Sequence, residues 1–94
     1  MKFEWDENKN KTNWEKHGVT FEEAETVFSD EYAVYVYDES HSTDEDRFNV
    51  IGMSGMFHEL YVCHCYRNGD EITRIISARR ATKSEIKLYE KGVV

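Results

Sequence analysis

Apolar residues recur at helical spacing in the first third of the chain. Thr20 and Glu23 match a capping box, which predicts a helix opening there and ending near residue 28. One face of this helix is predicted to be core, because its apolar positions repeat every three to four residues: Phe21, Ala24, Val27 and Phe28. The stretch "FEWD" near the start is either a short strand or an extended lead-in.

Capping residues place two further helices. Asp6 is suited to cap a helix over about residues 7–16, and Gly18 is well placed just after its end. Thr82 and Glu85 form a second capping box, which predicts a last helix through about residue 90.

The residues between these helices have a composition typical of β-strands. Four segments are rich in β-branched and aromatic residues: "YAVYVYD", "RFNVIGMS", "HELYVCHCYR" and "EITRIISAR". "NGD" at 68–70 is a hairpin signal between the last two. Short connections favour an antiparallel meander with helices packed on it. We therefore predict an α+β fold with two N-terminal helices, a four-stranded antiparallel sheet and one C-terminal helix.

Composition limits the class of protein. The 94 residues suit one small domain over 1–94, and 39% hydrophobic residues are enough for a packed core. No apolar run approaches the length of a membrane span, and a charged stretch directly after residue 3 argues against a signal peptide. The two cysteines argue against a disulfide framework and fit a reducing compartment, so a cytoplasmic protein is expected.

Charge is distributed unevenly along the chain. Residues 1–46 hold four lysines and no arginine against fourteen carboxylates, a net charge of −10. Residues 47–94 hold eight basic residues against five carboxylates, a net +3, which together give the formal −7. Such asymmetry hints at a partner of matching charge, although an acidic half can also serve only to solvate helices.

Basic residues collect where the last strand meets the last helix, in "RIISARRATKSE". Strict alternation would place Arg74 and Arg79 on opposite faces of that strand. Guanidinium groups beside the free N–H groups of a helix N-terminus suit a phosphate. Structural ion pairs with the acidic half are the alternative, and composition does not decide between the two.

The "CHC" triplet at 63–65 invites a metal interpretation. On a strand Cys63 and Cys65 share one face while His64 points to the other, and the chain has no second ligand pair. We expect no metal and no cofactor, with the cysteines acting as small core residues.

Taken together, several motifs resemble the BrnT family of bacterial toxins. They are "FEWDENKNKTNWEKHGVTFEEAETVF", Arg47 before "IGMS", and "RIISARRATKSE" followed by Tyr89. The resemblance implies a fold like the RelE ribonucleases and RNA cleavage that stops translation. It also implies neutralisation by a BrnA-like antitoxin that binds DNA through a ribbon–helix–helix domain, so that contact with DNA is only indirect.

Metal-free RNA cleavage needs a base for the ribose 2′-OH, cations for the phosphorane and an acid for the leaving oxygen. Arginines suit the charged role, and we expect Arg79, Arg74 and Arg47 to fill it. His17 is the candidate base or acid because of its intrinsic pKa, with Lys16 beside it. Further candidates for binding RNA are Arg80, Lys83 and Tyr89.

A different class of function fits the same residues. The chain could be a non-catalytic module that docks an antitoxin-like partner through its arginine patch. A module of that kind would not arrest growth, whereas a ribonuclease toxin would.

Overall fold

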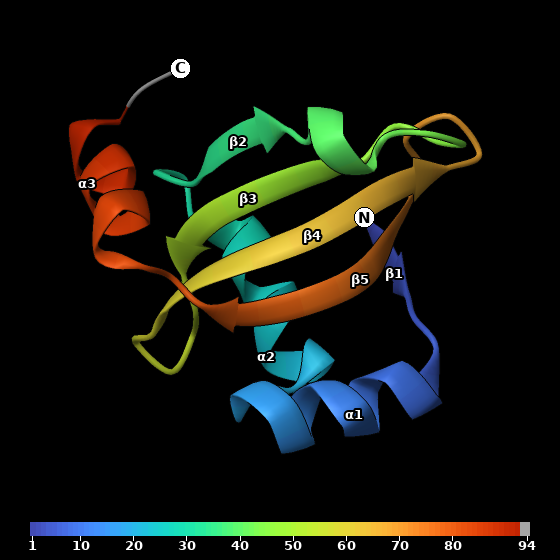
Figure 1. Cartoon of the computed structure of the whole chain (residues 1–94), viewed down its shortest axis with the longest axis horizontal. Helices are drawn as coiled ribbons and strands as arrows, with labels where there is room; N and C mark the ends of the chain where they lie inside the picture. The colour runs from blue at the N-terminus through green and yellow to red at the C-terminus, as the bar shows by residue number, and fades with distance from the viewer. Residues whose placement is uncertain (93–94) are drawn as a thin grey trace.

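The computed structural model describes residues 1–92, which form one mixed sheet with helices packed against it (Figure 1). The strands and helices are, in chain order, β1 (Lys2–Glu4), α1 (Glu7–His17), α2 (Phe21–Thr26), β2 (Val34–Tyr37), β3 (Phe48–Met53), β4 (Glu59–Arg67), β5 (Ile72–Arg80) and α3 (Lys83–Lys91). Two 3-10 turns, η1 (Val27–Ser29) and η2 (Glu39–His41), flank β2. The strand order across the sheet is β1-β5-β4-β3-β2.

The sheet has five strands, not the four predicted. β1 pairs in parallel with β5, while the other neighbours are antiparallel, so the sheet is mixed. The segment that includes β1 forms a strand because side chains on both of its faces contact the rest of the fold. Phe3 packs on Phe28 with ring centroids 5.2 Å apart, and Glu4 accepts a 2.9 Å hydrogen bond from Arg74. Three residues carry too little periodicity to reveal such a strand.

The predicted cap residues are confirmed, but at α2 only the Thr20 half of the capping box is formed, because the Glu23 carboxylate bonds Ser54 and His58 instead. The Asp6 carboxylate accepts the backbone N–H of Asn8 and Lys9, and Thr20 accepts that of Glu23. At α3 both halves of the predicted capping box are formed between Thr82 and Glu85. Gly18 ends α1 in the left-handed conformation, with φ 66°.

The core lies between α2 and one face of the sheet. Phe21, Ala24 and Val27 are fully buried, and they pack against buried apolar residues of the strands, namely Val50, Leu60, Val62, Ile75 and Ala78. Burial of this apolar surface is the main force that holds α2 to the sheet. Within residues 1–92 no helix is both long enough and apolar enough to cross a membrane.

The mostly polar helix α1 is held by buried asparagines. The Asn13 amide donates to the backbone carbonyl of Ala78 at 2.7 Å, and its oxygen accepts the Ala78 N–H at 3.0 Å. The side chain thereby replaces a strand neighbour on β5 where β1 has ended. The same amide bonds the Val19 carbonyl at 2.9 Å, so Asn13 joins α1, the turn after it and the sheet.

A register shift in β5 changes which residues share a face. Cys63 pairs with Ser77 and His64 with Ile75, which leaves Ile76 as an extra residue. Strict alternation is therefore broken, and the predicted separation of Arg74 and Arg79 is wrong. They pair with Cys65 and Tyr61 of β4, and residues 61 and 65 lie on one face of that strand. Both arginines thus lie on the face opposite α2.

Candidate active site

The face of the sheet opposite α2 is hollowed between the loop after β2 and the end of β5. The hollow, here called the arginine cavity, has a volume of about 350 Å³. Its lining comes from the loop and from three strands: Asp38, Ser40, His41, Arg47, Asn49, Tyr61, Cys63, Ile76, Ser77 and Arg79. Two of the three predicted phosphate-binding arginines, Arg47 and Arg79, therefore meet there.

Arg79 is fixed in place by α3. Its Nη1 and Nη2 donate to the two oxygens of Glu85 at 2.8 and 2.9 Å, and its guanidinium lies 4.2 Å from the centroid of the Tyr61 ring. The hydrogen bonds that Arg79 donates to Glu85 are the main cause that raises the pKa of Arg79, so the group stays charged. Nη1 also donates to the Arg80 carbonyl at 3.2 Å, whereas Nε forms no hydrogen bond within residues 1–92 and is the donor that remains for an anion.

Arg47 reaches the cavity from the loop. Its Nε lies 4.0 Å from a carboxylate oxygen of Glu45 and is buried without a hydrogen-bond acceptor among residues 1–92. The backbone around it is anchored, because its N–H donates to Ser42 Oγ at 2.9 Å and its carbonyl accepts the Asp38 N–H at 2.9 Å. A fixed backbone with an unsatisfied guanidinium donor suits a site that receives an acceptor-rich ligand.

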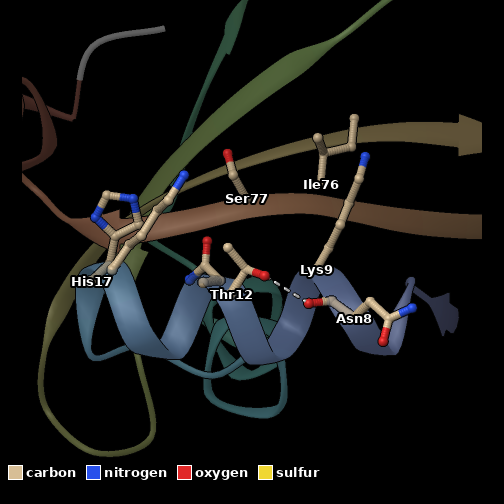
Figure 2. A pocket seen from close by; sticks show the side chains of 8 residues that line it. Asn8, Lys9, Thr12, His17, Ile76 and Ser77 are labelled. Atoms are coloured by element: carbon tan, nitrogen blue, oxygen red, sulfur yellow. Dashed lines mark hydrogen bonds between the residues drawn. The ribbon is translucent and has the colours of Figure 1, made fainter.

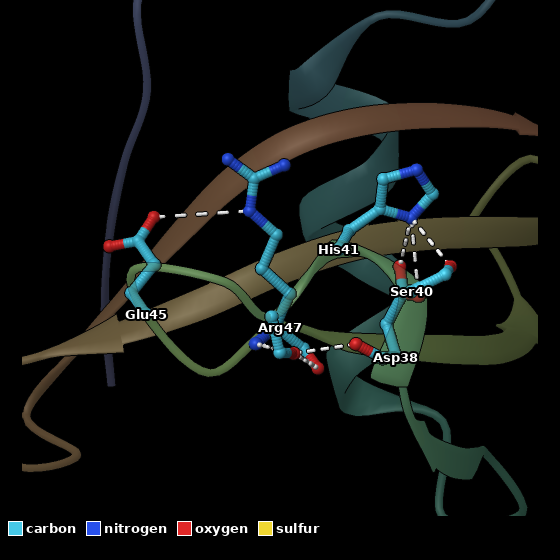
Figure 3. A network of polar contacts seen from close by, with 6 residues as sticks. Asp38, Ser40, His41, Glu45 and Arg47 are labelled. Carbon is cyan, nitrogen blue, oxygen red and sulfur yellow. Dashed lines mark hydrogen bonds and ion pairs between the residues drawn. The ribbon is translucent and has the colours of Figure 1, made fainter.

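His41 is a member of the cavity that the sequence reasoning did not select. Its Nδ1 lies 3.0 Å from Asp38 Oδ2 and 3.1 Å from Ser40 Oγ (Figure 3). Burial alone would raise the pKa of the Asp38 carboxyl, but hydrogen bonds from Ser40, Asn49 and His41 outweigh it and lower that pKa. The only sequence signal is the spacing of Asp38 and His41, three residues apart in a polar loop.

Lys16 and His17 lie on the other side of β5. They line a second hollow of about 290 Å³, the α1 cavity, together with Asn8, Lys9, Thr12, Asn13, Ile76 and Ser77. Figure 2 shows His17 and Lys9 rising from α1 toward Ser77 and Ile76 of β5. Because Ile76 and Ser77 line both hollows, the two cavities adjoin across β5.

The remaining predicted residues lie outside both cavities. Arg74 donates to Glu4 at 2.9 Å, so for it the ion-pair alternative is realised. The Tyr89 hydroxyl donates to Asp30 Oδ2 at 2.6 Å and joins α3 to the turn before β2; burial and this bond raise the pKa of Tyr89 to about 12. Arg80 and Lys83 are exposed.

The cysteine–histidine triplet of β4 divides between the two faces, as its alternation predicted. Cys63 and Cys65 are buried, and Cys63 lines the arginine cavity, whereas His64 is fully buried on the α2 side. Burial lowers the pKa of His64 to about 4, so the ring is neutral. No group of three or more potential metal ligands occurs among residues 1–92.

The fold and this hollow define an α+β domain with a phosphate-suited cavity on the open face of its sheet. Comparison with known proteins gives the family. The family model for the ribonuclease toxin BrnT of type II toxin–antitoxin systems matches residues 5–85, and the chain belongs to that family.

A solved structure agrees with this membership. The chain is similar to the ribonuclease toxin BrnT of Brucella abortus, whose crystal structure was determined at 1.1 Å resolution. The two are 30% identical with a TM-score of 0.67, over 88% of this chain and 99% of that one. No curated protein matches the chain at a significant level.

Proposed function

We propose that this chain is a single-domain toxin over 1–94 that cleaves RNA without a metal ion and so inhibits translation in the cytoplasm. The observation that carries the proposal is the meeting of Arg47 and Arg79 in one cavity on the open face of the sheet. Family membership supplies the class of activity, since the family is one of ribonuclease toxins. A RelE-like fold, implied by the resemblance, is consistent with the observed α+β architecture.

The chemistry proposed is attack of the ribose 2′-oxygen on the adjacent phosphorus. Negative charge grows on the nonbridging oxygens as the new P–O bond forms, and Arg47 and Arg79 stabilise that charge. Guanidinium groups are suited to this because they remain charged and bind phosphate through paired N–H donors. Metal independence is proposed because these residues supply the positive charge that a divalent ion would otherwise contribute.

The α1 cavity receives the neighbouring part of the RNA in this proposal. Lys16 contributes positive charge there, and His17 donates the proton to the leaving 5′-oxygen. Arg74, Arg80 and Lys83 stay candidates for contacts with more distant phosphates of the RNA. Tyr89 stays a candidate RNA contact, although its hydroxyl is engaged by Asp30.

A type II toxin implies an antitoxin partner. We propose a BrnA-like ribbon–helix–helix protein that covers the arginine cavity and so blocks RNA. Contact with DNA would then occur only through the antitoxin.

The test is induction in bacteria of the wild type and of Arg79→Ala, with growth and total RNA followed together. We expect arrest and RNA decay with the wild type, and neither with Arg79→Ala. Arg67→Ala is the matched control, because Arg67 pairs with Glu4 and Glu45 and lines neither cavity. Circular dichroism should show that all three proteins are folded.

The alternative is a non-catalytic module that docks its partner through the arginine cavity. The ion pair between Arg79 and Glu85 favours this alternative, because it shows that Arg79 can bind a carboxylate of the kind that an acidic protein partner would offer. Unimpaired growth and intact RNA with abundant folded wild-type protein would establish this alternative and end the nuclease proposal.

A further inference from the structure

Two histidines border the adjoining cavities, and their surroundings differ. The His41 ring is held by hydrogen-bond partners at Nδ1, whereas no hydrogen bond of the His17 ring is formed within residues 1–92. His41 shares its cavity with Arg47 and Arg79. The proton acceptor for RNA cleavage should stand beside the phosphate-binding groups, because the 2′-oxygen is bonded to the carbon next to the one that carries the phosphate.

We propose that His41, oriented by Asp38, is the general base that takes the proton from the ribose 2′-OH. The assignment rests on the proposed ribonuclease function and adds the residue that starts its reaction. Asp38 is a positioning residue, since it contacts His41 and not the reacting atoms.

The hydrogen bond to Asp38 selects the useful tautomer. An ionised carboxylate only accepts hydrogen bonds, so Nδ1 carries the proton and donates it to Asp38, and Nε2 keeps its lone pair. Figure 3 shows Nδ1 directed at Asp38 and Ser40, with the second ring nitrogen on the opposite side of the ring. The same view shows the Arg47 guanidinium and the His41 ring extending in the same direction from the loop.

The step balances without any further reactant. The lone pair of His41 Nε2 takes the 2′-OH proton as O2′ forms its bond to phosphorus. The P–O5′ bond breaks, its electron pair stays on O5′, and that oxygen takes a proton from the His17 imidazolium. The products are a 2′,3′-cyclic phosphate and a 5′-hydroxyl, and the proton gained by His41 returns to His17 through solvent.

Charged groups of both signs surround His41. The loop supplies the carboxylates of Asp38, Asp44 and Glu45, and the arginine cavity supplies the guanidinium groups of Arg47 and Arg79. The neutral phenol of Tyr61 and thiol of Cys63 complete the surroundings, and burial raises the pKa of both.

The experiment is cleavage of a defined RNA oligonucleotide by purified protein in EDTA, with the product ends identified. His41→Gln should reduce the rate by about 10²- to 10⁴-fold, the usual range for a lost general base. His58→Gln is the matched control: His58 hydrogen-bonds Glu23 at 2.8 Å and lines neither cavity, and this variant should cleave at the wild-type rate.

Two further measurements separate a base from a structural residue. Imidazole added to His41→Ala should restore cleavage, which it could not do if the ring served only to hold the loop. Asp38→Asn should lower kcat and leave KM close to wild type, because His41 loses the partner that orients its ring while Arg47 and Arg79 still bind the phosphate.

The outcomes are distinguishable. If His41→Gln cleaves RNA at the wild-type rate, this assignment is wrong and the ribonuclease proposal still stands. Loss of cleavage in His41→Ala that imidazole does not restore also overturns it, because the residue would then be structural. Absence of cleavage by folded wild-type protein overturns the ribonuclease proposal and this assignment together.

Discussion

The two cavities that adjoin across Ile76 and Ser77 carry similar residues and hold them differently. In the arginine cavity two charged side chains are held by hydrogen bonds: Arg79 by Glu85, and His41 by Asp38. In the α1 cavity Lys16 and His17 are exposed and form no hydrogen bond or ion pair within residues 1–92. Groups that are oriented before substrate arrives need not be ordered during the reaction, so they contribute more to rate.

The largest effect in this comparison should be seen at Arg47, which lines the arginine cavity with a buried Nε that has no acceptor within residues 1–92. Arg47→Ala should lower RNA cleavage by about 10²- to 10³-fold, the usual loss for one stabilising donor in a reacting site. Arg74→Ala is the comparison, since Arg74 also lies on the open face but is paired with Glu4 outside both cavities. Its removal should cost far less, as loss of a distant phosphate contact would.

Single-turnover cleavage rates at fixed ionic strength measure both variants. Equal losses for Arg47→Ala and Arg74→Ala would show that charge on the sheet matters and the cavity does not. Such a result would remove the basis for assigning the arginine cavity a role in catalysis.

A smaller effect is expected in the α1 cavity. His17→Gln should slow cleavage by about tenfold, because an unanchored acid can be replaced in part by water. Cleavage rates of His17→Gln and His41→Gln on the same RNA oligonucleotide provide the measurement. Lys9→Gln, which removes a charge from the same cavity, is the control for electrostatics alone. A loss larger than that of His41→Gln would reverse the comparison.

The helices and most of the strands can be predicted from the sequence, because they depend on residues that are close together in the chain. Thr82 and Glu85 identify the start of α3 because a capping box is formed by residues three apart. The four long strands are recognisable from β-branched and aromatic residues in the same way. The chemistry of arginine is enough to predict Arg47 and Arg79 as phosphate-binding residues, and the fold brings them to one cavity.

The missed features depend on contacts between distant segments. β1 is a strand only because β5, some seventy residues later, offers an edge to it. The extra residue at Ile76 reverses the face of everything before it on β5, and alternation alone cannot show a bulge. His41 reads as one residue of a solvated loop, because the sequence does not show that this loop lines one cavity together with Arg79.

The smallest effect concerns the helix that positions Arg79. Tyr89→Phe removes the hydroxyl that donates to Asp30 at 2.6 Å and ties α3 to the rest of the fold. We expect a loss of about 1.5–3 kcal/mol in the free energy of unfolding, the usual range for a hydrogen bond to a charged group, with cleavage close to wild type. Tyr32→Phe is the matched control, because the Tyr32 side chain is 70% exposed.

The pH dependence of that loss distinguishes this bond from simple packing. The pKa of Tyr89 is raised from 10.0 to about 12 in the folded protein, so the stabilisation is complete below about pH 10 and is lost as the pH rises toward 12. Burial would raise the pKa of Asp30, but hydrogen bonds from Met53, Tyr89 and Tyr32 outweigh it and lower that pKa, so the bond also weakens when acid protonates the carboxylate. Denaturant unfolding of wild type and Tyr89→Phe between these limits should show the stability difference shrinking at both ends. A stability difference that does not change with pH would mean that the hydroxyl acts only by filling space. A large loss of cleavage with unchanged stability would make Tyr89 an RNA contact instead.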